Sequence, residues 1–138
     1  MRYLGLDLGS RTLGIAVSDP TGTIASSYQV VRHMEEYDKL LVEVQKLVEE
    51  LKIDTVVLGF PKNMNNTIGP KGELSLEFQK KLEEVLTIPV VLQDERLTTK
   101  SAQDMLIKGN VSRKDRKKVV DGVAATIILQ SYLDRSDK

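Results

Sequence analysis

The chain has 138 residues, of which 41% are hydrophobic and 29% are charged, a balance that excludes the disordered and membrane-spanning classes. Lys and Arg together number 20, as do Asp and Glu, so any case for nucleic-acid binding must come from local patches. There is no cysteine for a disulfide scaffold or a thiolate zinc site, and no signal peptide or apolar run of membrane length, so we expect a cytoplasmic protein.

Three short strands open the chain, over residues 2–8, 13–18 and 24–31. Each is rich in Leu, Ile and Val, and Gly-Ser and Asp-Pro-Thr-Gly turn signals separate them, which predicts consecutive antiparallel strands. Residues 36–51 follow as an amphipathic helix, because their apolar side chains recur at the spacing of one helical stripe.

Strands and helices alternate in the rest of the chain. The apolar run TVVLGF at 55–60 predicts a parallel strand buried on both faces. We expect a polar, mobile loop over 61–72, a helix from Leu74 to Val85 and a strand over 88–95. Two more helices follow, one from Thr98 or Thr99 to about Lys108 and one from Ser112 to about Leu133.

The order of these elements predicts the fold class. Three antiparallel strands followed by βα units give an α/β domain with a five-stranded mixed sheet and helices on both faces. The order matches the ribonuclease H-like fold. We expect a single such domain over residues 1–138.

Asp7 is an acid inside an apolar strand. Strand alternation places Tyr3, Gly5 and Asp7 on one face and the neighbouring leucines on the other. Burying an unpaired carboxylate costs several kcal/mol, and a divalent cation is one of few partners that offset this cost. The alternative is an acid at the strand end that is either half in water or caps the turn at Gly9 and Ser10.

Asp94 and Glu95 end the last predicted strand, where sites in open α/β sheets gather. Neighbouring strand residues point to opposite faces, so one of the two joins Asp7 while the other braces the loop or pairs with Arg96. We favour Glu95 as the site residue because its longer side chain reaches further.

Asp121 shares a predicted helix face with Ala124, Ala125 and Ile128, at i+3, i+4 and i+7. The small alanines would let this helix lie close to the sheet, so a short Asp side chain could reach the acids at the strand ends. The alternative is a solvated Asp in an amphipathic helix.

Three converging carboxylates indicate a metal site. They would repel one another in an empty site, and oxygen-rich sites suit Mg²⁺ or Mn²⁺. Two such ions about 3.5–4 Å apart can activate water and stabilise the leaving oxygen of a phosphodiester. This chemistry needs neither histidine nor cysteine.

Four motifs resemble the YqgF/RuvX family of nucleases: GLDLGSRTLGIAVSD (5–19), GFPKNMNNTIGP (59–70), DERLTT (94–99) and KKVVDGVAATIIL (117–129). The resemblance implies a ribonuclease H-like fold and an acidic triad at Asp7, Glu95 and Asp121. It also implies one of two activities, maturation of the 5′ end of 16S ribosomal RNA precursors or cleavage of Holliday junctions. Where the family often has Lys-Arg, this chain has Arg11-Thr12, so one positive charge is missing.

Basic residues crowd the start of the last predicted helix, just before Asp121. They can bind phosphates beside the acids, although a basic run is often only a solvated helix face. Lys118, one turn before Asp121, is the best candidate to contact the scissile phosphate. The nucleic-acid-binding candidates are Arg11, Lys62, Asn63, Arg96, Arg113, Lys114, Arg116 and Lys117.

Three classes of function therefore compete. The first is a metal-dependent endonuclease acting on an RNA precursor or on branched DNA, for which junction cleavage would require a homodimer. The second is a phosphotransferase of the sugar-kinase type, suggested by the DLGS opening, although that fold needs two such domains. The third is a non-catalytic factor that binds ribosomal RNA, against which the retention of three acids speaks.

Overall fold

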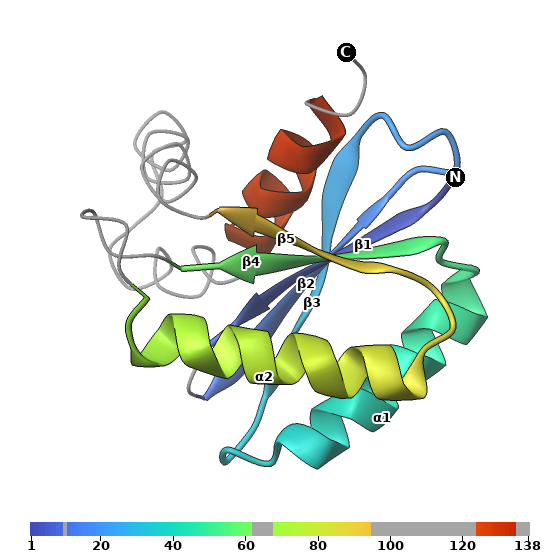
Figure 1. Cartoon of the computed structure of the whole chain (residues 1–138). Coiled ribbons are helices and arrows are strands. Elements are labelled where there is room, and N and C mark those ends of the chain that lie inside the picture. The colour runs from blue at the N-terminus through green and yellow to red at the C-terminus, as the bar shows by residue number, and fades with distance from the viewer. Residues whose placement is uncertain (10, 62–67, 95–123, 135–138) are drawn as a thin grey trace.

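The computed structural model describes residues 1–9, 11–61, 68–94 and 124–134, and contains a five-stranded sheet with strand order β3-β2-β1-β4-β5. The antiparallel part consists of β1 (Tyr3–Leu8), β2 (Thr12–Ser18) and β3 (Ala25–Arg32). On the other side of β1, β4 (Thr55–Phe60) and β5 (Val90–Asp94) pair in parallel (Figure 1). The predicted mixed sheet is confirmed.

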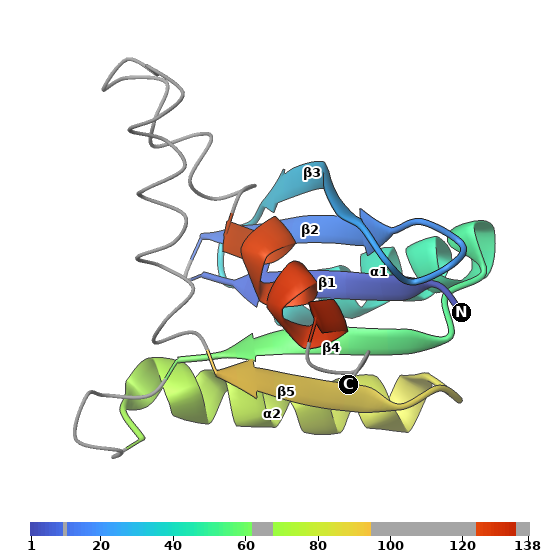
Figure 2. The ribbon, with the colours of Figure 1, turned by 90° about the horizontal axis from the view of Figure 1, so that it is seen from above.

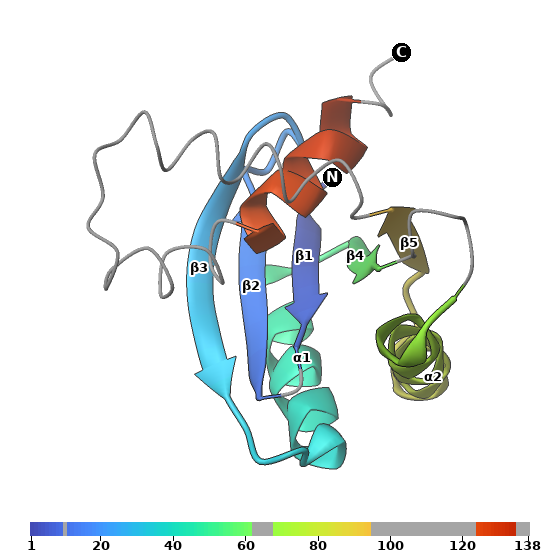
Figure 3. The same ribbon diagram turned by 90° about the vertical axis from the view of Figure 1, so that its left-hand side faces the viewer.

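Helices cover both faces of the sheet, as predicted. α1 (Tyr37–Leu51) and α2 (Pro70–Val85) pack on one face, and a helix over residues 124–134, here called the C-terminal helix, packs on the other (Figures 1, 2 and 3). The helix predicted between Thr98 or Thr99 and Lys108 lies outside the described residues. No helix in the described ranges is long and apolar enough to cross a bilayer.

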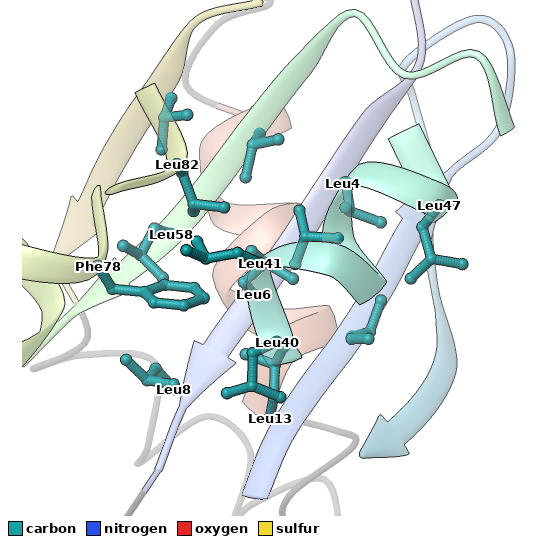
Figure 4. Packing of buried hydrophobic residues seen from close by; sticks show 14 of the residues in the cluster. Leu4, Leu6, Leu8, Leu13, Leu40, Leu41, Leu47, Leu58, Phe78 and Leu82 are labelled. Atoms are coloured by element: carbon teal, nitrogen blue, oxygen red, sulfur yellow. The ribbon is translucent and has the colours of Figure 1, made fainter. Parts of the chain in front are cut away.

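Two apolar clusters connect these layers. The larger one joins the sheet to α1 and α2, where the side chains of Leu6, Leu58 and Phe78 meet (Figure 4). The smaller one joins the sheet to the C-terminal helix. All six residues of β4 are buried, as expected for a parallel strand between two helical layers.

α2 begins at Pro70, so the expected start at Leu74 was wrong and the connection before it is shorter than the predicted loop 61–72. Gly69 is the N-cap, and Pro70 stands in the first helical turn, where its missing N–H costs nothing and its fixed φ favours the helix. β5 likewise begins at Val90 instead of residue 88, because Pro89 has no N–H to donate to a ladder.

The turn between β2 and β3 is built around Asp19, at the end of the sheet far from Asp7. The N–H groups of Ile24 and Thr23 donate to the Asp19 carboxylate at 2.9 and 2.8 Å. These bonds and one from the Thr21 hydroxyl hold the pKa of Asp19 well below its usual range, with the Ile24 bond the largest cause.

Gln130 fastens the C-terminal helix to this turn. Its Oε1 accepts the Ala25 N–H at 2.8 Å, and its Nε2 donates to the Thr23 carbonyl at 3.0 Å. Both bonds join residues far apart in the chain. The C-terminal helix is therefore attached to the sheet by polar bonds as well as by apolar packing.

Candidate functional site

Asp7 lies one residue before the end of β1, and its side chain is partly buried. On the opposite face of the strand, Leu4 and Leu6 are fully buried in the core beneath α1 and α2. Gly5, by contrast, meets the C-terminal helix. The predicted alternation is confirmed, and Asp7 belongs to the face of the sheet on which the C-terminal helix packs.

The strand positions beside Asp7 are glycines. In β2 the cross-strand partner of Asp7 is Gly14. In β4 the partner of Leu6 is Leu58, so Gly59 is the next position along. Neither glycine has a side chain that could crowd the carboxylate, which suits a bulky ligand such as a hydrated cation or a phosphate group. Sequence reasoning missed this feature because it depends on the register between strands.

Gln93 brings β5 into the same neighbourhood. It is 7% exposed, and Val91, two residues earlier, packs in the cluster under the C-terminal helix. Strand alternation therefore places Gln93 on the face that carries Asp7. β5 is two strands away from β1, a separation of about 10 Å at the usual strand spacing. Asp94 ends β5, and Glu95, the predicted second ligand, lies outside the described residues.

The C-terminal helix approaches the sheet closely at Gly5. A Cβ atom at that position would lie 2.7 Å from the Cβ of Leu129 and 3.1 Å from the carbonyl oxygen of Ala125. Ala125 and Leu129 are both fully buried. The close packing expected from the alanines is thus confirmed at Ala125. Asp121 itself, four positions earlier in the sequence, lies outside the described residues.

The turn that follows Asp7 is fixed by His33. The Gly9 N–H donates to the Thr12 carbonyl at 2.7 Å, and the His33 N–H donates to the Arg11 carbonyl at 2.9 Å. In the His33 ring, Nδ1 accepts the Glu35 N–H at 3.0 Å, so the neutral tautomer carries its proton on Nε2. Nε2 then donates to the Gly9 carbonyl at 3.1 Å.

Sequence reasoning gave His33 no role beyond its inability to form a histidine cluster. The ring is buried, and it packs against Tyr37 with the two ring centroids 5.4 Å apart. It connects the end of β3, the start of α1 and the turn after Asp7. No local motif reveals such a contact, because Gly9 and His33 are 24 positions apart.

Arg11 is the one predicted nucleic-acid-binding residue within the described ranges, and its side chain is exposed. Lys118 and the other candidates lie outside them: Lys62, Asn63, Arg96, Arg113, Lys114, Arg116 and Lys117. Within the same described ranges, no three His, Cys, Asp or Glu side chains gather closely enough to hold a metal ion. Two of the three expected ligands, Glu95 and Asp121, are not in those ranges.

Comparison with known proteins identifies the family. A family model described as "RuvX: Holliday junction resolvase" matches residues 1–135. The chain belongs to the RuvX family. A relative from Clostridium botulinum is 50% identical over 138 residues, which is all of both chains. One from Bacillus subtilis is 53% identical over 135 residues, 97% of this chain and 98% of the relative. Both bear the name "Putative pre-16S rRNA nuclease".

Solved structures of Holliday junction resolvases share the fold. RuvC from T. thermophilus, in complex with a Holliday junction substrate, has a TM-score of 0.63 at 16% identity, covering 100% of this chain and 97% of RuvC. The Fowlpox virus resolvase, in complex with Holliday junction DNA, has a TM-score of 0.61 at 14% identity, with both chains fully covered. These matches confirm the predicted ribonuclease H-like fold for this member of the RuvX family.

Proposed function

We propose that this protein is a metal-dependent endonuclease that hydrolyses phosphodiester bonds in structured nucleic acid. The observation that carries the proposal is the position of Asp7, a partly buried carboxylate near the end of a central strand, with glycines as its strand neighbours. The match to the RuvX family over residues 1–135 supports a nuclease. It also argues against the phosphotransferase hypothesis, which rested on the DLGS opening alone.

Asp7, Glu95 and Asp121 are the proposed metal ligands. Glu95 comes two residues after Gln93, so strand alternation favours Glu95 over Asp94 for the side of the sheet that carries Asp7. Asp121 precedes Ala125 by four residues, about one helical turn, and Ala125 packs against Gly5, two residues before Asp7. The sequence distances from Gln93 and Ala125 therefore support the proposal that the three acids share one site.

The donor set fits a hard divalent cation. Three carboxylates supply only oxygen ligands, which Mg²⁺ and Mn²⁺ prefer. When bound, two such ions would activate a water molecule and stabilise the leaving oxygen. Lys118 would contact the scissile phosphate and neutralise part of its charge. Arg11, Arg96 and the basic residues before Asp121 would bind the phosphates on either side.

For the substrate, we place 5′-end processing of the 16S ribosomal RNA precursor first, because relatives at about half identity over the full chain carry that name. Cleavage of Holliday junctions is the second candidate, supported by the family description and the resolvase fold. Junction cleavage would require two active sites, and hence a homodimer. A non-catalytic ribosomal RNA-binding role is the third.

The decisive experiment is a cleavage assay on a labelled 16S precursor and on a four-way junction, with Mg²⁺ or Mn²⁺. We expect wild type to cut at least one substrate. Asp7→Asn, Glu95→Gln and Asp121→Asn should each lose about 10²-fold or more, since every proposed ligand is needed to position the reacting groups.

Asp94→Asn is the matched control for Glu95→Gln, because it removes the neighbouring carboxylate at the end of the same strand. It should keep most of the activity. If wild type cuts neither substrate, or if the three variants cut as well as wild type, the proposed function is wrong. Binding of the 16S precursor without cleavage would favour the non-catalytic role.

A further inference from the structure

A bulge in β3 changes which side chains share a face with Asp7. Ser27 pairs with Ala16, but Gln29 pairs with Ile15, so Tyr28 is an extra residue in β3. Because of this extra residue, each β3 side chain after Tyr28 points to the face opposite to the one that the alternation of the first half of β3 would give.

After the bulge, Arg32 pairs with Thr12 and Val30 pairs with Gly14, the residue that also pairs with Asp7. Without the bulge, the register of the first half of β3 would have set Val31 opposite Thr12.

The core confirms which face these residues occupy. Val31 pairs with Leu13, and both pack in the cluster beneath α1 and α2. Alternation then directs Val30 and Arg32 to the opposite face, which is the face of Asp7. Both side chains are exposed. In Figure 3 the arrowhead that ends β3 lies away from the described part of the C-terminal helix, residues 124–134.

Two exposed arginines, Arg11 and Arg32, lie near this end of the sheet. Arg11 is exposed in the turn after Asp7, and its carbonyl oxygen accepts the N–H of His33, the residue after Arg32, at 2.9 Å. Across the described residues, the ion pair observed is Lys39 with Glu36, and neither arginine takes part in it. Two guanidinium groups near the end of β3 are thus available to an anionic partner.

We infer that Arg32, together with Arg11, binds the phosphodiester backbone of the substrate strand that leads away from Asp7. This inference rests on the proposed nuclease function and adds Arg32 to the residues proposed to bind the substrate backbone. Arg32 lies two strands away from Asp7 across the sheet and two residues further along β3 than Val30. These two offsets together give a Cα separation of about 12 Å. One strand of a duplex carries a phosphate about every 3.4 Å of helix axis, and neighbouring phosphates lie further apart than this rise, so Arg32 contacts a phosphate only a few positions from the scissile bond.

The test measures binding in the Asp7→Asn background, so that cleavage does not interfere. Dissociation constants for the 16S precursor and for the four-way junction are measured over a range of KCl concentrations, with and without Arg32→Gln. Loss of one phosphate contact lowers the slope of log K against log salt by about 0.7–0.9. At about 0.1 M salt this corresponds to binding about 5- to 8-fold weaker. Comparing the two substrates shows whether Arg32 contributes to the binding of RNA, DNA or both.

Lys46→Gln is the matched control, since it removes one exposed positive charge from α1, on the opposite side of the sheet. It should leave the salt slope unchanged. Arg32→Lys should keep the slope, because the positive charge remains. Thermal unfolding of each variant checks that the fold is intact.

If Arg32→Gln has the same salt slope as Lys46→Gln on both substrates, the inference is overturned, while a wild type that still cuts leaves the nuclease proposal standing. If neither substrate binds, the inference is also overturned. If Arg32→Gln reduces the salt slope but wild type binds without cutting, the contact between Arg32 and the backbone is supported and the nuclease proposal is refuted.

Discussion

Gly5→Ala tests whether the close approach of the C-terminal helix shapes the proposed site. The new Cβ would lie 2.7 Å from the Cβ of Leu129 and 3.1 Å from the carbonyl oxygen of Ala125. Neither contact can be relieved by a rotation, because one atom is fixed to the helix backbone and the other belongs to it. The helix has to move outward by about 1 Å to restore a normal carbon–carbon contact.

The stability cost follows from this overlap. Overpacking a well-packed interface by one methyl group costs about 1–3 kcal/mol. For a domain of this size, a loss of about 2 kcal/mol in the free energy of unfolding corresponds to a fall in Tm of about 6–10 °C. Asp121 is expected to move with the helix, and a displacement of about 1 Å in a catalytic group can cost about 10²-fold in rate.

Thermal unfolding followed by circular dichroism measures the first effect, and cleavage of the preferred substrate well below the Tm measures the second. Ser27→Val is the matched control, because Ser27 continues the cross-strand row of Gly5 and Ala16 but is exposed at the sheet edge. It should change stability by less than about 0.5 kcal/mol. A Tm for Gly5→Ala equal to that of Ser27→Val would refute the packing argument.

Two further predictions concern the turns at opposite ends of the sheet. His33→Phe keeps an aromatic ring but removes the bonds to the Gly9 carbonyl and the Glu35 N–H, so it should lower the free energy of unfolding by about 1–3 kcal/mol in urea titrations. An unchanged urea midpoint would show that the hydrogen bonds of the His33 ring do not stabilise the fold. The lowered pKa of Asp19 stabilises the fold at pH values above the unfolded-state pKa of about 3.9. Wild type should therefore have a higher Tm than Asp19→Asn near neutral pH, and this difference should disappear as the pH falls below about 4. A Tm difference that does not change with pH would show that the Asp19 carboxylate does not stabilise the fold through its lowered pKa.

Most of the fold could be predicted from local patterns. Period-two apolar strands, the helical stripe of α1 and the continuous apolar run of β4 each report the burial of their own residues. The start of α2 was placed wrongly because Pro70 was included in the polar loop 61–72, although a proline is equally compatible with the first turn of a helix. One or two residues at the end of a helix or strand often fit more than one local structure, so its exact first residue cannot be predicted from them.

The candidate site was only partly predictable, for a different reason. The alternation of β1 sufficed to place Asp7 on one face, and the structure agrees. The roles of Gly14 and Arg32 depend on pairing between strands and on a bulge at Tyr28, which no single segment encodes. Glu95 and Asp121 remain predictions supported by their sequence distance from Gln93 and Ala125.

The contact between Gly5 and Leu129 joins two residues that are far apart in the sequence. Closing so long a loop carries a large entropic cost, so contacts of this kind are expected late in folding. A nascent chain that does not yet include Leu129 lacks this contact between the C-terminal helix and β1. The proposed nuclease therefore cannot assemble its acids until the segment that carries Asp121 has left the ribosome, and shorter nascent chains are expected to be inactive.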